Sequence, residues 1–70
     1  MPLSPLQNRV HQHRQTCDLT QQALADGVGV TRQTIISIEK GNYEPSVRLA
    51  LKLARVLGAS VEDLFYEPNV

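Results

Sequence analysis

Residues 19–41 read LTQQALADGVGVTRQTIISIEKG. Two short helical patterns lie in this stretch, at about 21–26 and about 32–40, and each follows a threonine suited to cap a helix. Gly27 and Gly29 separate the two patterns and supply the tight turn between them. We therefore expect a second helix that projects steeply from the first.

The side chains of this stretch divide into an inner and an outer set. The inner positions are small or aliphatic: Ala25, Val30, Ile35 and Ile38. Ala25 is small enough to let two helices cross closely. The outer positions at the start of the later helix are Arg32, Gln33 and Ser37. These polar groups can form hydrogen bonds with a ligand such as the edges of DNA bases.

Three further helices are predicted around this pair. Apolar residues at helical spacing predict a first helix from about Pro5 to Thr16, and Ser46 caps a Leu- and Ala-rich helix over Val47–Leu57. Ser60 with Asp63 resembles a capping box. It opens a last turn or two that carries Val61, Leu64, Phe65 and Tyr66. The expected fold is all-α, a compact five-helix bundle.

The length allows one domain, which we place at residues 6–66 between an irregular segment 1–5 and a tail 67–70. The first residues lack the basic and apolar regions of a secretory signal, and no apolar run is long enough to span a membrane. The expectation from these features is a cytoplasmic protein with no membrane contact.

The charge balance is unusual for a nucleic-acid-binding protein. Seven Lys and Arg residues are balanced by seven Asp and Glu residues. All seven basic residues lie between Arg9 and Arg55, whereas the last nine residues carry three acidic and no basic side chains. A neutral total thus conceals a basic body and an acidic end, and only the face that meets DNA needs to be positive.

Catalytic and metal sites are not indicated. His13 and Cys17 are four residues apart on one helical face, but a structural zinc ion requires four ligands. A core histidine and a buried thiol are the preferred interpretation. No serine lies in an arrangement that suggests a nucleophile, and no phosphate-binding glycine loop is present. We predict a protein that is not an enzyme and uses neither a metal nor a cofactor.

The stretch 19–41 resembles the Xre/Cro-type, phage-repressor-like helix-turn-helix family. The similarity continues through Asn42-Tyr43-Glu44-Pro45-Ser46 and through the ending Leu57-Gly-Ala-Ser-Val-Glu-Asp-Leu-Phe65, so it covers about residues 7–66. The resemblance implies the five-helix fold of phage repressors, with the second and third helices forming the helix-turn-helix. It also implies a transcriptional regulator, most simply a repressor, that binds double-stranded DNA at a palindromic operator as a homodimer.

The resemblance assigns roles to individual positions. Residues Arg32, Gln33 and Ser37 are implied to contact base edges in the major groove. Backbone or mixed contacts are implied for Thr20, Gln21, Thr31, Thr34, Lys40 and Asn42. Arg14 and Glu39 match an ion pair that ties the first helix to the third. Candidates for the dimer contact are Leu53, Leu64, Phe65 and Tyr66.

The sequence departs from the family pattern at three positions. His13 replaces a usual leucine, Asp18 replaces a frequent glycine, and Gly27 replaces a common lysine or arginine. These changes affect expected affinity and stability more than expected function. A second interpretation also stays open, because some small relatives act as antitoxins whose main partner is a protein.

Overall fold

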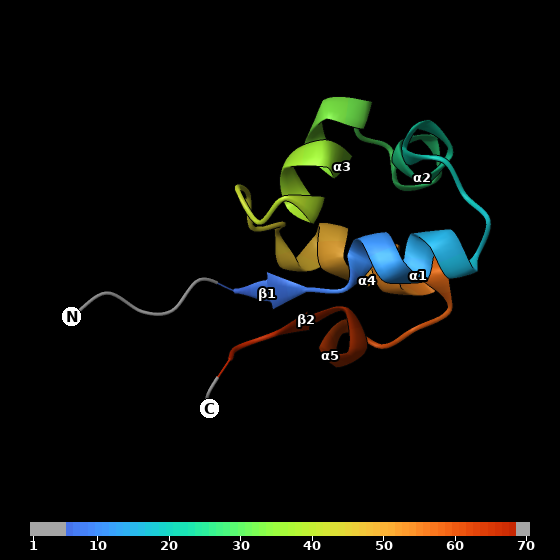
Figure 1. The fold of residues 1–70 in the computed structure, drawn as a ribbon. Coiled ribbons are helices and arrows are strands. Elements are labelled where there is room, and N and C mark those ends of the chain that lie inside the picture. The colour runs from blue at the N-terminus through green and yellow to red at the C-terminus, as the bar shows by residue number, and fades with distance from the viewer. Residues whose placement is uncertain (1–5, 69–70) are drawn as a thin grey trace.

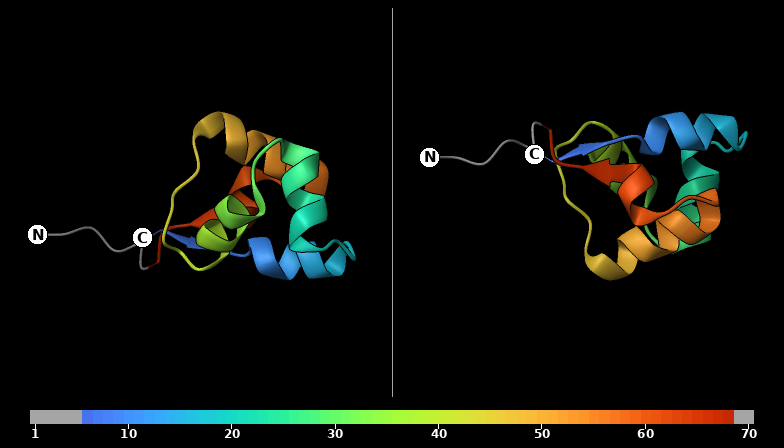
Figure 2. Two further views of the ribbon diagram at one scale, coloured as in Figure 1. Left: turned by 90° about the horizontal axis from the view of Figure 1, so that it is seen from above. Right: turned by 90° about the horizontal axis from the view of Figure 1, so that it is seen from below.

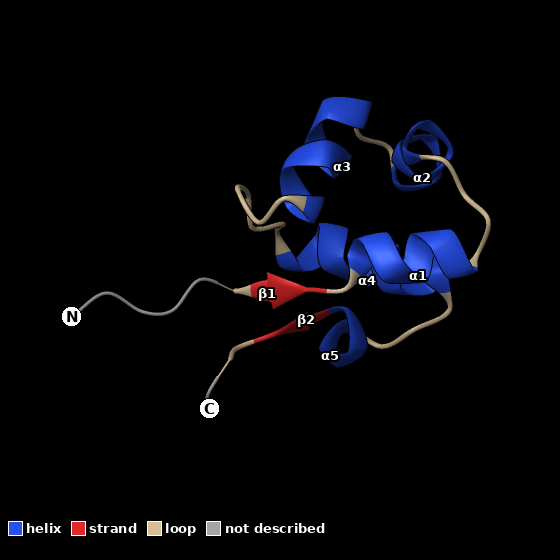
Figure 3. Ribbon diagram, in the orientation of Figure 1, coloured by secondary structure: helices blue, strands red, loops and turns tan. Residues whose placement is uncertain are grey.

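The computed structural model describes residues 6–68 and contains five helices and one pair of very short strands (Figure 3). The elements in chain order are β1 (Gln7–Asn8), α1 (Val10–Thr16), α2 (Gln21–Val28), α3 (Arg32–Glu39), α4 (Val47–Leu57), α5 (Val61–Leu64) and β2 (Phe65–Tyr66). The expected five-helix fold is confirmed. The segment 1–5 and the last two residues of the expected tail lie outside the described residues.

The helices form three tiers around one core (Figure 1). α2 and α3 lie side by side, α1 and α4 lie beneath them, and α5 with the two strands lies on the opposite side of α1 and α4. Seen from above, α2 and α3 are adjacent but not parallel (Figure 2). The side chains that are fully buried at the centre are Val10, Leu24, Ile35, Ile38, Leu53 and Leu64. Every tier therefore contributes to the same core.

Local signals determine where most helices begin. The hydroxyl oxygens of Thr20, Thr31 and Ser46 each accept a hydrogen bond from a backbone N–H three residues later, which satisfies a group that the helix itself cannot pair. Ser60 and Asp63 form the expected reciprocal capping box. These four helix starts agree with the sequence-based prediction.

The first helix begins at Val10, so its predicted start at Pro5 is wrong. Gln7 and Asn8 are extended because they pair antiparallel with Tyr66 and Phe65. The side chain of Asn8 stabilises this arrangement. Its Oδ1 accepts from the Val10 N–H at 3.1 Å, and its Nδ2 donates to the Ile38 carbonyl at 2.9 Å.

The chain also departs from the prediction at the ends of two helices. α2 continues past Asp26 to Val28, which is buried, and ends at Gly29 in the left-handed conformation (φ 77°). α5 ends at Leu64, so Phe65 and Tyr66 form β2 instead of a further helical turn. The left-handed Gly29 ends α2 locally, whereas the end of α5 coincides with the pairing of β2 with the distant β1.

Two expectations about burial are wrong. Cys17 is exposed and is not a buried thiol, and its Sγ donates to the Leu57 carbonyl at 3.5 Å. His13 is only half-buried and is not part of the core.

Leu53 and Leu64 are fully buried within the single chain, so they cannot form a dimer surface. Phe65 and Tyr66 are half-buried and partly accessible.

None of the helices within residues 6–68 combines the length and the apolar character needed to cross a membrane. In the same part of the chain, no group of three His, Cys, Asp or Glu side chains is placed to hold a metal ion.

Candidate nucleic-acid interface

The turn between α2 and α3 fixes the direction of α3. Gly29 adopts a left-handed conformation, and the Val30 N–H then donates to the Ala25 carbonyl at 3.0 Å. Ala25 is fully buried, which lets the two helices pack closely at the turn. The Thr31 hydroxyl oxygen accepts from the Thr34 N–H at 3.3 Å and thereby starts α3. These contacts fix the orientation of α3 relative to α2.

The three residues expected to contact bases lie along the outer side of α3. Arg32 and Gln33 are exposed, and Ser37 is half-buried. A groove of about 350 Å³ runs beside them. It is lined by Thr31, Gln33, Thr34, Ser37, Asn42 and Tyr43. Two of the three expected residues therefore line one concave surface, and Arg32 lies next to it in sequence at the start of α3.

The residues expected at the DNA backbone lie at the start of α2 and at both ends of α3. Thr20 and Thr31 use their oxygens as caps, yet a hydroxyl group that accepts a hydrogen bond still has its own proton to donate. Lys40 is exposed at the C-terminal end of α3, and Asn42 is exposed in the loop that follows. This arrangement provides hydrogen-bond donors at the start of α2 and at both ends of α3.

The ion pair expected between Arg14 and Glu39 is present. Arg14 Nε donates to Glu39 Oε2 at 2.7 Å, and Arg14 Nη2 donates to Glu39 Oε1 at 3.3 Å. The two side chains are only 11% and 7% exposed. Arg14 Nη1 also donates to the Leu19 carbonyl at 2.9 Å. The pair joins α1 to the end of α3 and to the residue that precedes α2.

Gln21 belongs to the same cluster, which the sequence did not indicate. Its Nε2 donates to Glu39 Oε1 at 3.2 Å, and its side chain is half-buried. His11 Nδ1 lies 3.4 Å from the same carboxylate oxygen. The amide group of Gln21 is therefore held by Glu39 and not extended into solvent, as a free phosphate contact would be.

The cluster alters the acidity of Glu39. Burial by itself raises the pKa of this carboxyl group, but hydrogen bonds from Arg14 and Gln21 and the positive charge of Arg14 lower it more. The net effect is a pKa below the ordinary value of 4.5. Glu39 is consequently ionised at neutral pH and keeps Arg14 paired.

Tyr43 is a candidate that the sequence analysis did not select. Its side chain is 49% exposed, although it is one of the largest apolar groups of the chain, and it lines the groove beside α3. The available signal was its position in the loop next to Asn42. Its place in the groove depends on the turn at Gly41, which helical periodicity does not reveal.

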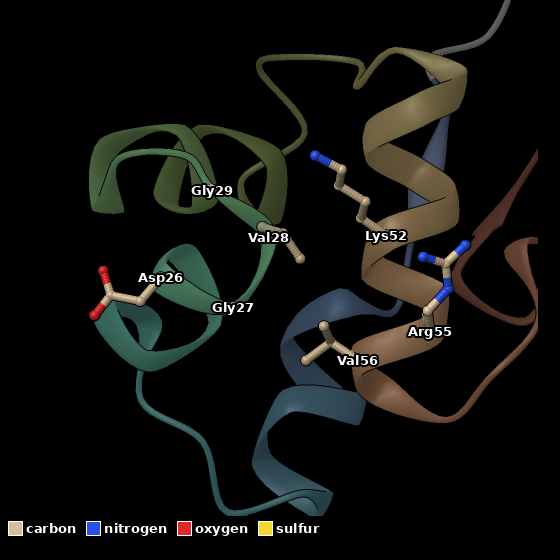
Figure 4. A pocket seen from close by; sticks show the side chains of 7 residues that line it. All are labelled: Asp26, Gly27, Val28, Gly29, Lys52, Arg55 and Val56. Carbon is tan, nitrogen blue, oxygen red and sulfur yellow. The ribbon is translucent and has the colours of Figure 1, made fainter.

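A second groove lies between the C-terminal part of α2 and α4 (Figure 4). It has a volume of about 360 Å³, and the cationic side chains Lys52 and Arg55 line it from α4. Val56 of the same helix points toward Gly27. This groove shares no lining residue with the one beside α3.

Comparison with known proteins identifies the family. A helix-turn-helix family model matches residues 10–64, from the start of α1 to the end of α5. The chain belongs to the Xre/Cro-type helix-turn-helix family. This helix-turn-helix protein is 48% identical over 65 residues to an uncharacterized HTH-type transcriptional regulator of Methanocaldococcus jannaschii, and the match covers 91% of the chain and 98% of that relative.

Two solved structures resemble the helix-turn-helix chain in fold and in sequence. The P22 c2 repressor in complex with a synthetic operator is 30% identical, with a TM-score of 0.75 over 77% of this chain and 82% of the repressor chain. A chain of the SinR protein/SinI protein complex is 31% identical, with a TM-score of 0.72, and the match covers 77% of this chain and 53% of that one.

These similarities establish the class of the helix-turn-helix protein. It is a DNA-binding transcriptional regulator, and its family is not a family of enzymes. The family predicted from the sequence is confirmed. The individual contact residues are not tested by the comparisons and remain predictions.

Proposed function

We propose that the chain binds a specific double-stranded DNA operator and represses transcription from it. In this proposal α3 enters the major groove, where Arg32 contacts guanine and Gln33 contacts adenine. Ser37 can form a hydrogen bond with either base. The observation that carries the proposal is the position of these polar side chains on the outer side of α3, where Arg32 and Gln33 are exposed and Gln33 and Ser37 line the groove, on a helix that the Glu39 cluster holds in place. The P22 c2 relative is a repressor that was crystallised with a synthetic operator. This similarity supports repression as the mode of regulation and operator DNA as the target.

The backbone of the duplex would be held at the start of α2 and at both ends of α3. Thr20 and Thr31 can donate through their hydroxyl groups, and Lys40 and Asn42 can contact the strand at the other end. Thr34 is an additional contact in this proposal, and Gln21 contributes through its backbone N–H at the start of α2, because Glu39 holds its side chain. A protein bound to chromosomal DNA in this way would be cytoplasmic and associated with the nucleoid.

The test is selection of bound DNA from a pool of random duplexes. We expect the wild-type protein to enrich a palindromic sequence, because a homodimer presents two α3 helices to half-sites about one helical turn apart. The double variant Arg32→Ala/Gln33→Ala should lose that preference, at a cost of about 1–3 kcal/mol for each lost bidentate contact. Its residual binding should still weaken steeply with added salt, because the phosphate contacts remain.

A matched control uses one arginine and one glutamine that lie away from α3. The variant Arg55→Ala/Gln12→Ala removes two exposed side chains from α4 and α1. It should retain the sequence preference. The proposal fails if no sequence is enriched, or if the α3 double variant enriches the same sequence as the wild-type protein.

An alternative function is that of an antitoxin-like or other module whose main partner is a protein. One observation favours it, because Lys52 and Arg55 line a groove that lies apart from α3, and Leu51 of the same helix is half exposed. The similarity to a chain of the SinR protein/SinI protein complex is in keeping with this alternative. A partner that copurifies in a fixed ratio and binds with α3 mutated would support it.

A further inference from the structure

The loop after α3 folds back along the helix that it leaves. Gly41 is in the left-handed conformation, with φ 80°, and its N–H donates to the Ile38 carbonyl at 2.9 Å. The Asn42 N–H then donates to the Ser37 carbonyl at 2.9 Å. A glycine adopts this conformation without a steric penalty, which permits the tight reversal. The next residue, Tyr43, then lines the same groove as Ser37.

The groove formed by this reversal has two different walls. Gln33 and Ser37 stand on the helix side, and Asn42 and Tyr43 stand on the loop side. Four large apolar side chains are exposed in the described part of the chain, and three of them (Val47, Leu51 and Val56) are on α4. The fourth, Tyr43, lies beside α3.

The chemistry of the lining indicates what the groove receives. None of its six lining residues is charged, so a phosphate contact here would depend on neutral donors such as Thr31, Thr34 and Asn42 at its edge. The half-exposed tyrosine ring adds a large apolar surface to a lining that also contains Gln33. In the major groove of DNA, the thymine 5-methyl group is the apolar feature that distinguishes one base pair from another.

We propose that Tyr43 is a specificity-determining residue whose ring contacts the 5-methyl group of a thymine beside the base pair bound by Gln33. This inference rests on the proposed function, since it requires α3 to lie in the major groove. It adds a preference for thymine at one position in each half-site. The phenol hydroxyl is not needed for that preference.

The experiment removes the methyl group alone. In the operator selected by the wild-type protein, each thymine is replaced in turn by deoxyuridine, and the dissociation constant is measured by fluorescence anisotropy. We expect one position in each half-site at which the wild-type protein loses about fourfold in affinity, the effect of one buried methyl group. Tyr43→Ala should bind the thymine and deoxyuridine operators equally well, and Tyr43→Phe should discriminate like the wild-type protein.

Val47→Ala is the matched control, because it truncates another exposed apolar side chain, which is 78% exposed on α4. It should leave the thymine preference unchanged. Circular dichroism melting of each variant checks that the fold is kept, as expected for a change at an exposed side chain.

Several results would overturn the inference. Tyr43→Ala could retain full discrimination against deoxyuridine, or it could bind all sequences more weakly by the same factor, which would indicate a phosphate contact. Loss of discrimination in Tyr43→Phe would assign the effect to the hydroxyl group. Failure of the proposed function looks different, because the wild-type protein would then enrich no sequence, and the role of Tyr43 would fall with it.

Discussion

Glu39 shows how one side chain can hold the proposed DNA-binding helix in position through contacts within the protein. Its carboxylate is at the end of α3 and accepts hydrogen bonds from Arg14 on α1 and Gln21 on α2. Both Arg14 and Glu39 are almost completely buried, so each charge depends on the other for compensation. The cluster therefore couples the three helices that form the proposed interface.

The first prediction at this scale is a loss of stability in Glu39→Gln. Removing the negative charge leaves the buried Arg14 guanidinium unpaired, and we expect the free energy of unfolding at neutral pH to fall by about 3 kcal/mol. A domain of this size has little stability to spare. Urea unfolding followed by circular dichroism measures the change. Arg55→Ala, which removes an exposed cation on α4, should have little effect.

The same variant has a defined pH dependence. The pKa of Glu39 is lower in the folded than in the unfolded chain, so the pair contributes fully above about pH 4.5 and its contribution is lost as the pH falls through the folded pKa. The difference between wild type and Glu39→Gln should therefore shrink as the pH is lowered from about 7 to 3. Hydrogen bonds from the backbone and side chain of Ser60 also lower the pKa of Asp63. The variant Asp63→Asn therefore separates the contribution of Asp63 to the pH dependence of stability from that of Glu39. A constant difference at all pH values would exclude the ion pair as the cause.

At the level of helices, the sequence predicted what depends on neighbouring residues and missed what depends on distant ones. The caps at Thr20, Thr31, Ser46 and Ser60 are local, because each side chain bonds to a backbone group three residues away. The pairing of β1 with β2 joins the two ends of the domain and cannot be inferred from helical spacing. It displaced the start of α1 and ended α5 early.

The candidate site divides in the same way. The order of Arg32, Gln33 and Ser37 along one helix face follows from helical periodicity. The bond from Gln21 to Glu39 and the return of Tyr43 to the side of Ser37 depend on how separate elements pack. The sequence pattern within one helix therefore predicts which side chains lie on its outer face. It does not predict which side chains from other elements lie next to that face.

Two glycines of α2 and its cap lead to opposite predictions. Gly27 is inside α2, and a Cβ atom built there would lie 3.7 Å from both methyl groups of Val56, which is ordinary contact distance. Gly27→Ala should therefore raise the free energy of unfolding by about 0.5–1 kcal/mol. Gly29 has φ 77°, so Gly29→Ala should lower it by about 1 kcal/mol, because a side chain is strained in this conformation. Thermal melting of the two variants measures both effects, and destabilisation by Gly27→Ala would show that the helix does not tolerate the added methyl group.

For the whole molecule, the placement of the cations matters more than their sum. The net charge is zero, and among residues 6–68 Arg14 is paired with Glu39 and Arg9 lies 4.0 Å from the centre of the Tyr66 ring. Three further cations, Arg48, Lys52 and Arg55, are on α4. The two remaining cations of residues 6–68, Arg32 and Lys40, are at the start of α3 and at its C-terminal end. We infer that affinity for DNA depends strongly on dimerisation, which doubles the number of contacts on one palindrome.

The last prediction concerns that dimer. Leu53 and Leu64 are fully buried in one chain, so the partly accessible Phe65 and Tyr66 remain as the proposed contact. Tyr66→Ala should weaken binding to the complete palindrome much more than binding to an isolated half-site, because only the palindrome requires two copies. Leu51→Ala, at a half-exposed position on α4, is the control and should change neither. Leu53→Ala should instead lower stability by about 2–5 kcal/mol, as expected for a cavity in the core. Sedimentation velocity with and without operator would decide the matter: a wild-type protein that stays monomeric on the palindrome contradicts the dimer, and β2 would then serve only to cover the core.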